Sequence, residues 1–434
     1  MCYNKKYMED LMEYKRFNCN SYNIHTIKTD KFKTIRMEII FSREVEKEKM
    51  PLFTFLADIM SDSCQNYPRR KDIAIKLEEL YKASFYSVTN KVGNLFTITF
   101  VLEFIDPVYI NDKSYLEEVL SFPFEVINNP LAKNQEFDLT NFNIVKRRIK
   151  EEIESIKDSS DKLALLNALK TMDINSPSSF LVLGTLEDLN NITPANLYQA
   201  YLDLFEHSLC DIFLIGNLNV NKTVEIIKNN FKNRVIKLKK INMLVNNKSH
   251  NKVIRQFSSS NFVQSTLVMV YNLKNLSKDE KNIAFHVFNY LLGSGGMNSK
   301  LYKNLRTDNS LCYGVRSLYL KYDELLIILV SLDKKNIKKA ENLIRKSIAE
   351  MIQGDYNDEE IKDAIKNLIF SLKLGLDNNT SILNNYIFNY FDDLPLVEER
   401  IKQIAKVEKK DLIKCGKCLS LNTIYIQESG VNED

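Results

Sequence analysis

The two halves of the chain carry the same order of expected elements, and this internal repeat limits the fold more than any other feature. In the first half, a strand-like segment at residues 34–41 is followed by a polar stretch and a helix-like segment at 51–61. In the second half, a strand-like segment at 266–271 is followed by a polar stretch and a helix-like segment at 279–292. Apolar periodicity distinguishes the strands from the helices, so the pattern predicts two copies of one unit.

The later elements also repeat. Residues 72–81 form an expected helix before strands 84–89 and 95–103, and residues 299–306 form one before strands 311–320 and 324–332. Each half then has a helix (115–128 and 336–351), a longer helical zone (138–172 and 358–372) and a late strand (211–216 and 422–427). This order predicts an α+β fold of two tandem homologous domains, each a mostly antiparallel sheet covered by helices on one face.

A basic stretch separates the two copies. Residues 222–255 contain ten basic residues and one acid, Glu225, although the whole chain of 434 residues has a net charge of only +4. We therefore predict domains at 1–232 and 256–434, joined by a basic linker at 233–255. The linker is interpreted as a solvated connector, with a phosphate-binding patch as the alternative. No interleaved aromatic residues or nucleic-acid motif accompany it, so no nucleic-acid partner is expected.

Composition limits where the protein can act. No apolar run approaches the roughly 18 residues that a membrane helix needs, and the first twenty residues carry acids without an apolar core. Seven cysteines, an odd number, are typical of reduced thiols, so a cytoplasmic location is expected. Cys415 and Cys418 form a lone CxxC pair, interpreted as small apolar residues where a helix leads into the last strand. The histidines His25, His207, His250 and His286 are too widely spaced for a short paired-histidine zinc motif, so each is expected to be structural.

Glycines cluster in the second half. Of eleven glycines in the chain, Gly293, Gly295 and Gly296 follow an expected helix. One glycine is enough to end a helix, whereas three indicate a sharp turn or the close approach of another chain. A helix stop followed by a turn is the alternative. Arg306 and Tyr313 come next, and a guanidinium with a phenol hydroxyl can hold a carbonyl or carboxylate of an extended peptide.

These segments resemble the insulinase/pitrilysin family of metallopeptidases, which includes mitochondrial processing peptidase. The resemblance is carried by SGGMNSKLYKNLR followed by SLCYGVRS, and in the first half by DKFKTIRMEIIF and YPRRKDIAIKLEELYKASFYSVTNKVGN. It implies two homologous domains that form a bowl. It also implies that Gly295, Gly296, Arg306 and Tyr313 help to hold substrate, as in the non-catalytic subunit of bacterial two-subunit members. The first-half segments resemble a small Firmicutes subgroup that is linked by name to elongation factor P modification.

Active members of that family carry the zinc motif H-x-x-E-H on the first long helix. The resemblance places this motif on Thr54, Ala57 and Asp58, with Glu152 as the counterpart of a later ligand. A solvated helix face is the alternative account of Glu152. Alanine cannot activate water, and one hydroxyl with one carboxylate makes a poor zinc site. Helical periodicity puts Thr54, Ala57 and Asp58 opposite the apolar stripe of their helix, so they are expected to remain a surface.

We therefore predict a catalytically inactive peptidase subunit that binds and positions peptide for a zinc-bearing homologous partner in a heterodimer. No cofactor is expected on this chain itself. One alternative is a stand-alone peptide-binding or scaffold protein, for example a homodimer. The other is an active zinc metalloendopeptidase with unusual ligands. A composition heavy in Asn, Lys and Ile indicates an A+T-rich bacterial genome.

Overall fold

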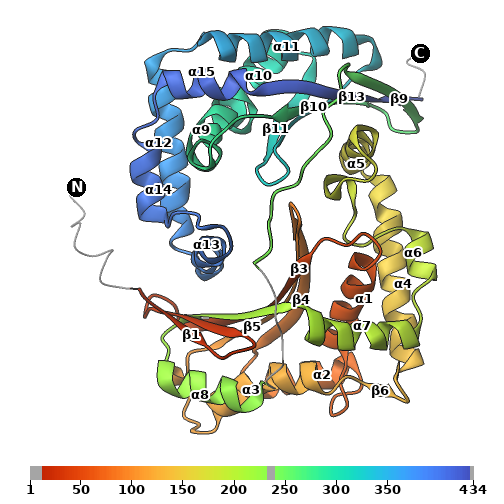
Figure 1. The fold of residues 1–434 in the computed structure, drawn as a ribbon, viewed down its shortest axis with the longest axis vertical. Helices are drawn as coiled ribbons and strands as arrows, with labels where there is room; N and C mark the ends of the chain where they lie inside the picture. Colours follow the sequence, from red (N-terminus) through yellow and green to blue (C-terminus); the bar gives the residue numbers. More distant parts are fainter. Residues whose placement is uncertain (1–11, 232–239, 431–434) are drawn as a thin grey trace.

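A computed structural model describes residues 12–231 and 240–430 of the chain, which form two stacked halves built around separate sheets (Figure 1). The first sheet has the strand order β1-β2-β8-β3-β5-β4. Its strands are β1 (Glu13–Asn18), β2 (Asn23–Lys28), β3 (Thr34–Glu44), β4 (Ser84–Val92), β5 (Leu95–Ile105) and β8 (Leu209–Gly216). Only the β2–β8 pair is parallel. The predicted antiparallel α+β architecture is confirmed.

The second sheet has the order β11-β12-β10-β13-β9, again with one parallel pair, β13–β9. Its strands are β9 (Ile254–Ser260), β10 (Ser265–Leu273), β11 (Cys312–Leu320), β12 (Leu325–Leu332) and β13 (Leu419–Ser429). β10 occupies the place that β3 has in the first sheet, between the late strand of its half and the second strand of a hairpin. The internal repeat is therefore a repeat of topology.

Alternating side chains bind the outer helices to the first sheet. Met37, Ile39 and Phe41 of β3 are fully buried in the core beneath the helices, whereas Ile40 points to the opposite face. The helices of this half are α1 (Met50–Asp62), α2 (Arg70–Glu79), α3 (Tyr115–Asn128), α4 (Leu139–Ser155), α5 (Ser160–Met172), α6 (Leu186–Asn190), α7 (Pro194–His207) and α8 (Val220–Asn230). A two-stranded ribbon, β6 (Ala132–Lys133) with β7 (Glu136–Phe137), precedes α4.

The helices of the second half are interrupted in one region. The expected helix at 279–292 consists of α9 (Phe285–Asn289) between π-helical segments at Glu280–Ala284 and Tyr290–Ser294. The next one, α10 (Lys300–Tyr302), continues as a third π-helical segment, Lys303–Thr307. The remaining helices are regular: α11 (Ile337–Gln353), α12 (Asp358–Gly375), α13 (Asn379–Asp392), α14 (Val397–Ile404) and α15 (Lys409–Lys417). No helix in the described part of the chain is long and apolar enough to cross a membrane.

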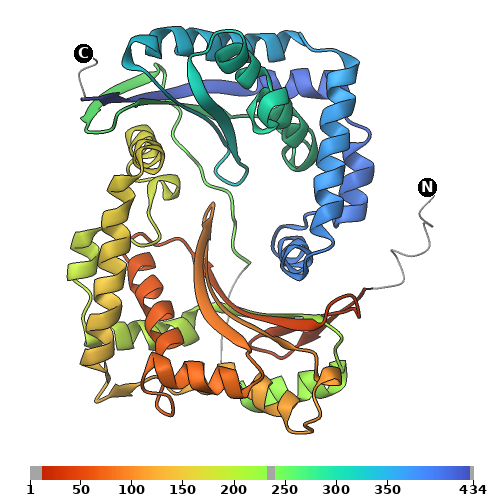
Figure 2. The same ribbon diagram turned by 180° about the vertical axis from the view of Figure 1, so that it is seen from behind.

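Each half lends a helix to the inner face of the other half's sheet, as Figures 1 and 2 show from opposite sides. Ala164 and Ala168 of α5 pack against Val268 and Val270 in the second sheet. In return, Leu383 of α13 packs in one cluster with inner-face residues of the first sheet, among them Ile40 and Phe213. The sequence predicts helices on one face of each sheet. The exchange of α5 and α13 adds helical cover to the other, inner face.

The segment after the first half runs between the tips of two hairpins. Residues 233–239 of the predicted linker lie outside the described residues, and residues 240–253 have no regular structure. Met243 and Val245 are only 5% and 4% exposed, whereas most of the residues around them, including Lys240 and Lys248, are exposed, as expected of a solvated connector. Backbone pairing explains the burial: Asn94 N–H donates to the Met243 carbonyl at 2.8 Å, and Val245 N–H donates to the Tyr322 carbonyl at 2.8 Å.

Candidate functional site

The residues to which the resemblance assigns the zinc motif make contacts within the chain. Thr54 lies on α1, and its hydroxyl donates a hydrogen bond to the Val182 carbonyl at 3.0 Å. Thr54 and Ala57 are 5% and 1% exposed, because the segment that contains Val182 lies over this side of the helix. The expectation that this face remains a surface is wrong for these two residues, since periodicity within α1 carries no information about a segment about 130 residues away.

Asp58 is held by an arginine. Arg148 of α4 contacts Asp58 at 3.2 Å and Asp62 at 2.7 Å, so one guanidinium bridges two carboxylates of α1. Burial raises the pKa of Asp58, and the positive charge of Arg148 opposes that rise. Glu152 lies one turn beyond Arg148 on the exposed side of α4. The positively charged side chain of Arg148 therefore occupies the space next to Asp58 that a metal ion would need.

These residues do not fit a zinc ion. Thr54 donates its proton to a carbonyl, Ala57 has no ligand atom, and Asp58 is paired with Arg148. In residues 12–231 and 240–430, no group of three His, Cys, Asp or Glu side chains is placed to hold a metal. The chemistry of the donor set, a hydroxyl and one paired carboxylate, is far from the nitrogen and sulfur ligands that zinc prefers.

The glycine-rich loop joins α9 to α10 at the surface. Gly296 has a φ of +63°, and an added Cβ would meet nothing within 4 Å. A side chain at Gly295, in contrast, would approach Tyr290 to 2.6 Å. Met297, the next residue, is 76% exposed. Gly295 therefore lets the loop fold back on the preceding helix, and Gly296 gives the turn its left-handed backbone and leaves space above it.

Arg306 and Tyr313 are brought together by the turn between the third π-helical segment and β11. The Arg306 guanidinium lies 5.0 Å from the centre of the Tyr313 ring, and its Nη1 donates to the Cys312 carbonyl at 2.9 Å. Tyr313 is 79% exposed, although its ring lies against the arginine. The guanidinium keeps other N–H groups, and the Tyr313 hydroxyl is open to solvent, so both can bind an incoming acceptor.

The strand that carries Tyr313 is also an edge of its sheet. β11 pairs only with β12, so one side of its backbone has no strand partner. An unpaired strand edge next to exposed hydrogen-bonding side chains is the geometry that takes up an extended peptide. Residue types and spacing revealed the Arg–Tyr pair, but not the edge position, which depends on the order of strands.

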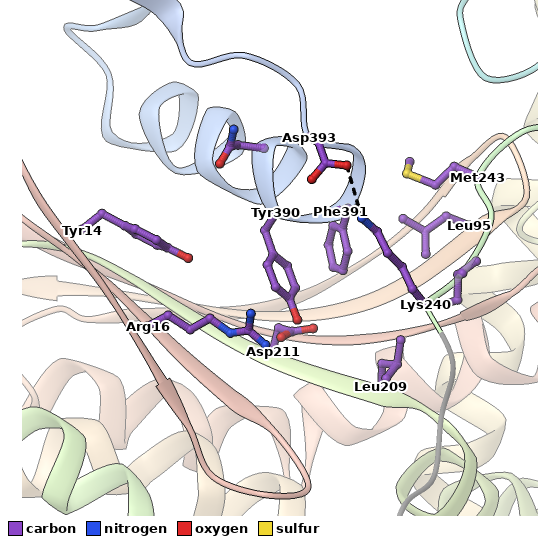
Figure 3. Close-up of a pocket in the computed structure, with 12 residues that line it drawn as sticks. Tyr14, Arg16, Leu95, Leu209, Asp211, Lys240, Met243, Tyr390, Phe391 and Asp393 are labelled. Carbon is purple, nitrogen blue, oxygen red and sulfur yellow. Dashed lines mark hydrogen bonds and ion pairs between the residues drawn. The ribbon is translucent and has the colours of Figure 1, made fainter. Parts of the chain in front are cut away.

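A pocket of about 620 Å³ lies where the end of α13 meets the first sheet (Figure 3). Its polar lining residues come from β1, β8, the end of α13 and the segment at Lys240, and Asn23 of β2 contacts two of them. Asn23 donates both to Asp211, at 2.9 Å, and to the Tyr390 hydroxyl, at 3.1 Å. The Arg16 guanidinium stacks on the Tyr390 ring at 5.0 Å, and Lys240 pairs with Asp393 at 3.5 Å across the pocket mouth. These groups satisfy one another, so the pocket acts as a polar joint between the halves.

The other residues that the sequence singled out have structural contacts. Cys415 is fully buried near the end of α15, just before β13, and burial raises its pKa to about 12, as expected of an inert thiol. His25 lies 2.8 Å from the Tyr14 hydroxyl and 3.2 Å from Asp211. His207 pairs with Asp203 at 2.8 Å, and His250 lies 2.9 Å from the Met172 carbonyl. His286 faces a separate cavity, described below.

Comparison with known proteins agrees with this geometry. Residues 191–368 match a family described as the peptidase M16 inactive domain. The probable inactive metalloprotease YmfF of Bacillus subtilis (strain 168) is 26% identical over 92% of this chain and 94% of its own. The non-peptidase homolog YmxG of Helicobacter pylori (strain ATCC 700392 / 26695) is 25% identical over 69% of this chain and 68% of its own.

Residues 191–368 thus match the M16 peptidase family, and most of the chain is similar to inactive homologues of that family.

Solved structures agree over the whole length of this M16 homologue. A conserved protein from Enterococcus faecalis V583 superposes with a TM-score of 0.91 at 25% identity, covering 97% of this chain and 100% of its own. A peptidase M16 inactive domain from Pseudomonas fluorescens superposes with a TM-score of 0.79 at 16% identity, covering 97% and 99%. The insulinase/pitrilysin resemblance is thus confirmed. With the zinc motif replaced, the chain is an inactive M16 peptidase homologue.

Proposed function

We propose that this inactive M16 homologue binds a peptide and positions it for a separate, zinc-bearing homologous chain. The observation that carries the proposal is the exposed cluster of Gly296, Arg306 and Tyr313 beside an unpaired strand edge, in a chain whose own zinc position is filled by an arginine. The cluster supplies donors and room for a backbone, but neither a metal nor a general base. In this proposal, catalysis is left to the partner.

The contribution of such a subunit is geometric. Arg306 and the Tyr313 hydroxyl would hold a peptide carbonyl or terminus, and the free side of β11 would align its backbone. Holding reacting groups in attack geometry can lower a barrier by several kcal/mol, even when the holding chain supplies no reacting group. We place this work in a heterodimer in the cytoplasm, and the predicted domains at 1–232 and 256–434 belong to the same proposal.

The test is a reconstitution. The chain is mixed with a similar-sized homologue that retains both zinc-motif histidines, and peptide cleavage is followed with and without Arg306→Ala and Tyr313→Ala. We expect kcat/KM of the mixture to fall at least about tenfold for each variant, which corresponds to about 1.4 kcal/mol. The control is Arg345→Ala, which removes an exposed arginine of α11 that is paired with Glu341. Full cleavage by the Arg306 and Tyr313 variants would show that the positioning role is wrong.

The same experiment separates the two alternatives. A stand-alone peptide-binding protein or homodimer would bind peptide without any partner and would not speed cleavage by the zinc-bearing chain. An active enzyme with unusual ligands would retain stoichiometric zinc in elemental analysis and would lose its activity on chelation. Because Thr54 and Asp58 are already committed to Val182 and Arg148, we expect no stoichiometric zinc on this chain.

A further inference from the structure

A second cavity, of about 420 Å³, lies wholly within the second half, between α9, the β11–β12 turn and helices α12 to α14. We call it the α12–α14 cavity. Most of its wall is apolar, formed by Leu368, Leu372, Phe388, Leu394 and Ile404. Its polar groups are Asn282, His286, Lys321 and Arg400, together with Ser371 and the hydroxyl of Tyr322. The cavity shares no residue with the Gly296, Arg306 and Tyr313 cluster.

Arg400 is the cation in this cavity that lacks a counter-ion. Among the described residues it takes part in no ion pair, and its one side-chain hydrogen bond is from Nη2 to the Asn385 side chain. Its Nε is buried without an acceptor. Glu398 acts on Arg400 only from a distance, and burial lowers the arginine's pKa. A buried guanidinium without a counter-ion costs free energy, and an anion in the cavity, bound through the other N–H groups of Arg400, would supply the missing charge.

The other charges around the cavity are matched or absent. Lys321 bonds to Asp392 at 2.7 Å, so its charge is already balanced. Burial lowers the pKa of His286 to about 4, with Lys321 and Arg400 adding to the effect, so this histidine is neutral at pH 7. Asn282 is 4% exposed, and its Oδ1 has no hydrogen-bond partner. The cavity is therefore lined by one cation without a counter-ion, Arg400, and by the amide of Asn282, among largely apolar residues.

We propose that the α12–α14 cavity binds a small monocarboxylate with an apolar body. The carboxylate would accept hydrogen bonds from Arg400 and from the Nδ2 group of Asn282, and the body would lie against Leu372, Phe388 and Ile404. Apolar walls with a few convergent polar groups are typical of small-molecule sites of this size. Two sources share this chemistry: a free acyl acid, and the C-terminal residue of a peptide. Binding here is independent of the two-chain proposal above.

The first test uses the unaltered full-length chain and matched probes. Octanoate and octanamide represent the acyl source, and N-acetyl-L-leucine and its amide represent a peptide terminus, with inorganic phosphate as a charge-only probe. We expect one carboxylate to bind in calorimetry at least about tenfold more tightly than its amide and than phosphate. If octanoate binds in this way, the natural ligand is a free acyl acid; if N-acetyl-L-leucine does so, it is the C-terminal residue of a peptide. Equal binding of acid and amide by both pairs, or equal binding of phosphate, would overturn the proposal.

The second test uses variants. Arg400→Gln is expected to weaken the preferred carboxylate at least about tenfold, because it removes the charge and the donor fork. Binding of the matched amide should hardly change. Arg70→Gln is the control, since Arg70 has a side chain 76% exposed and lies in the first half. Asn282→Leu provides a second variant if Arg400→Gln does not fold. Unchanged carboxylate affinity in a folded variant of either residue would overturn the proposal.

Discussion

At the scale of single residues, the positions to which the family resemblance assigns a zinc motif make other contacts. Arg148 occupies the space beside Asp58 and pairs with it and with Asp62, so the helix face that would carry a zinc site carries an ion-pair cluster. The sequence was sufficient to predict the missing ligands, because residue types decide that. The sequence could not predict the role of Arg148, because the partners of an arginine on a charged helix depend on which other helix packs against that helix.

Histidine 286 provides a residue-scale prediction about pH. Its folded pKa, about 4, lies below the ordinary value of 6.5. Between these pH values the unfolded chain binds a proton that the folded chain does not, so the free energy of unfolding should fall as the pH drops through this window. His286→Gln removes this component. Urea unfolding of parent and variant should therefore show the variant gaining relative stability as the pH falls from about 6.5 to about 4; a constant difference would contradict the assignment.

At the scale of elements, most strands and long helices could be predicted because their apolar periodicity is local. α3 begins and ends at the expected residues, 115 and 128, and α11 and α12 differ from expectation only by one to three residues at their ends. The zone at 138–172 is instead two helices, α4 and α5, because Ser159 caps a new helix with its side chain. The π-helical segments leave no sequence period that distinguishes them from α-helix, so they could not be predicted.

Packing of α13 on the sheet of the other half gives an element-scale prediction. Leu383→Ala removes a fully buried side chain that packs in one cluster with Ile40 and Phe213, and should lower the free energy of unfolding by about 2–5 kcal/mol. Hydrogen exchange should become faster in β8, a strand of the first half, although the change is in the second. The control, Leu374→Ala in α12, alters a side chain that is 53% exposed and should change stability by less than about 0.5 kcal/mol. If hydrogen exchange in β8 were as slow in Leu383→Ala as in the parent, the expected coupling between α13 and the first sheet would be contradicted.

At the scale of the whole molecule, the halves also meet at a junction of hairpin turns that no local pattern indicates. The hairpin turn at Gly93, the segment around Met243 and the turn at Tyr322 come together, although they are far apart in sequence. Buried polar contacts extend the junction: Ser178 donates to Asp323 at 2.6 Å, and Asn247 donates to the Asp323 carbonyl at 2.7 Å. Contacts of such long sequence separation are specified by the finished fold, which is why the sequence could not predict them.

Glycine 93 tests this junction. Its φ is +59°, and an added Cβ would lie 2.1 Å from the Met243 carbonyl oxygen and 2.5 Å from the Cβ of Tyr322. Gly93→Ala should therefore lower the free energy of unfolding by about 2 kcal/mol or more, through backbone strain and overpacking. In Gly375→Ala the nearest atom would be 3.7 Å away, in ordinary contact, so stability should be unchanged or slightly higher. Equal urea midpoints for Gly93→Ala and the parent would contradict this tight packing, because they would mean that the turn at Gly93 can move away from Met243 and Tyr322 without loss of stability.

The exchange of α5 and α13 between the halves has a consequence for how such a gene can change. A recombination event that replaced one half with that of a distant relative would bring in a helix shaped for a foreign sheet, and would remove the helix that the remaining sheet requires. The two halves, although they share one topology, are therefore expected to change together, through compensating substitutions in each helix and the sheet that it covers.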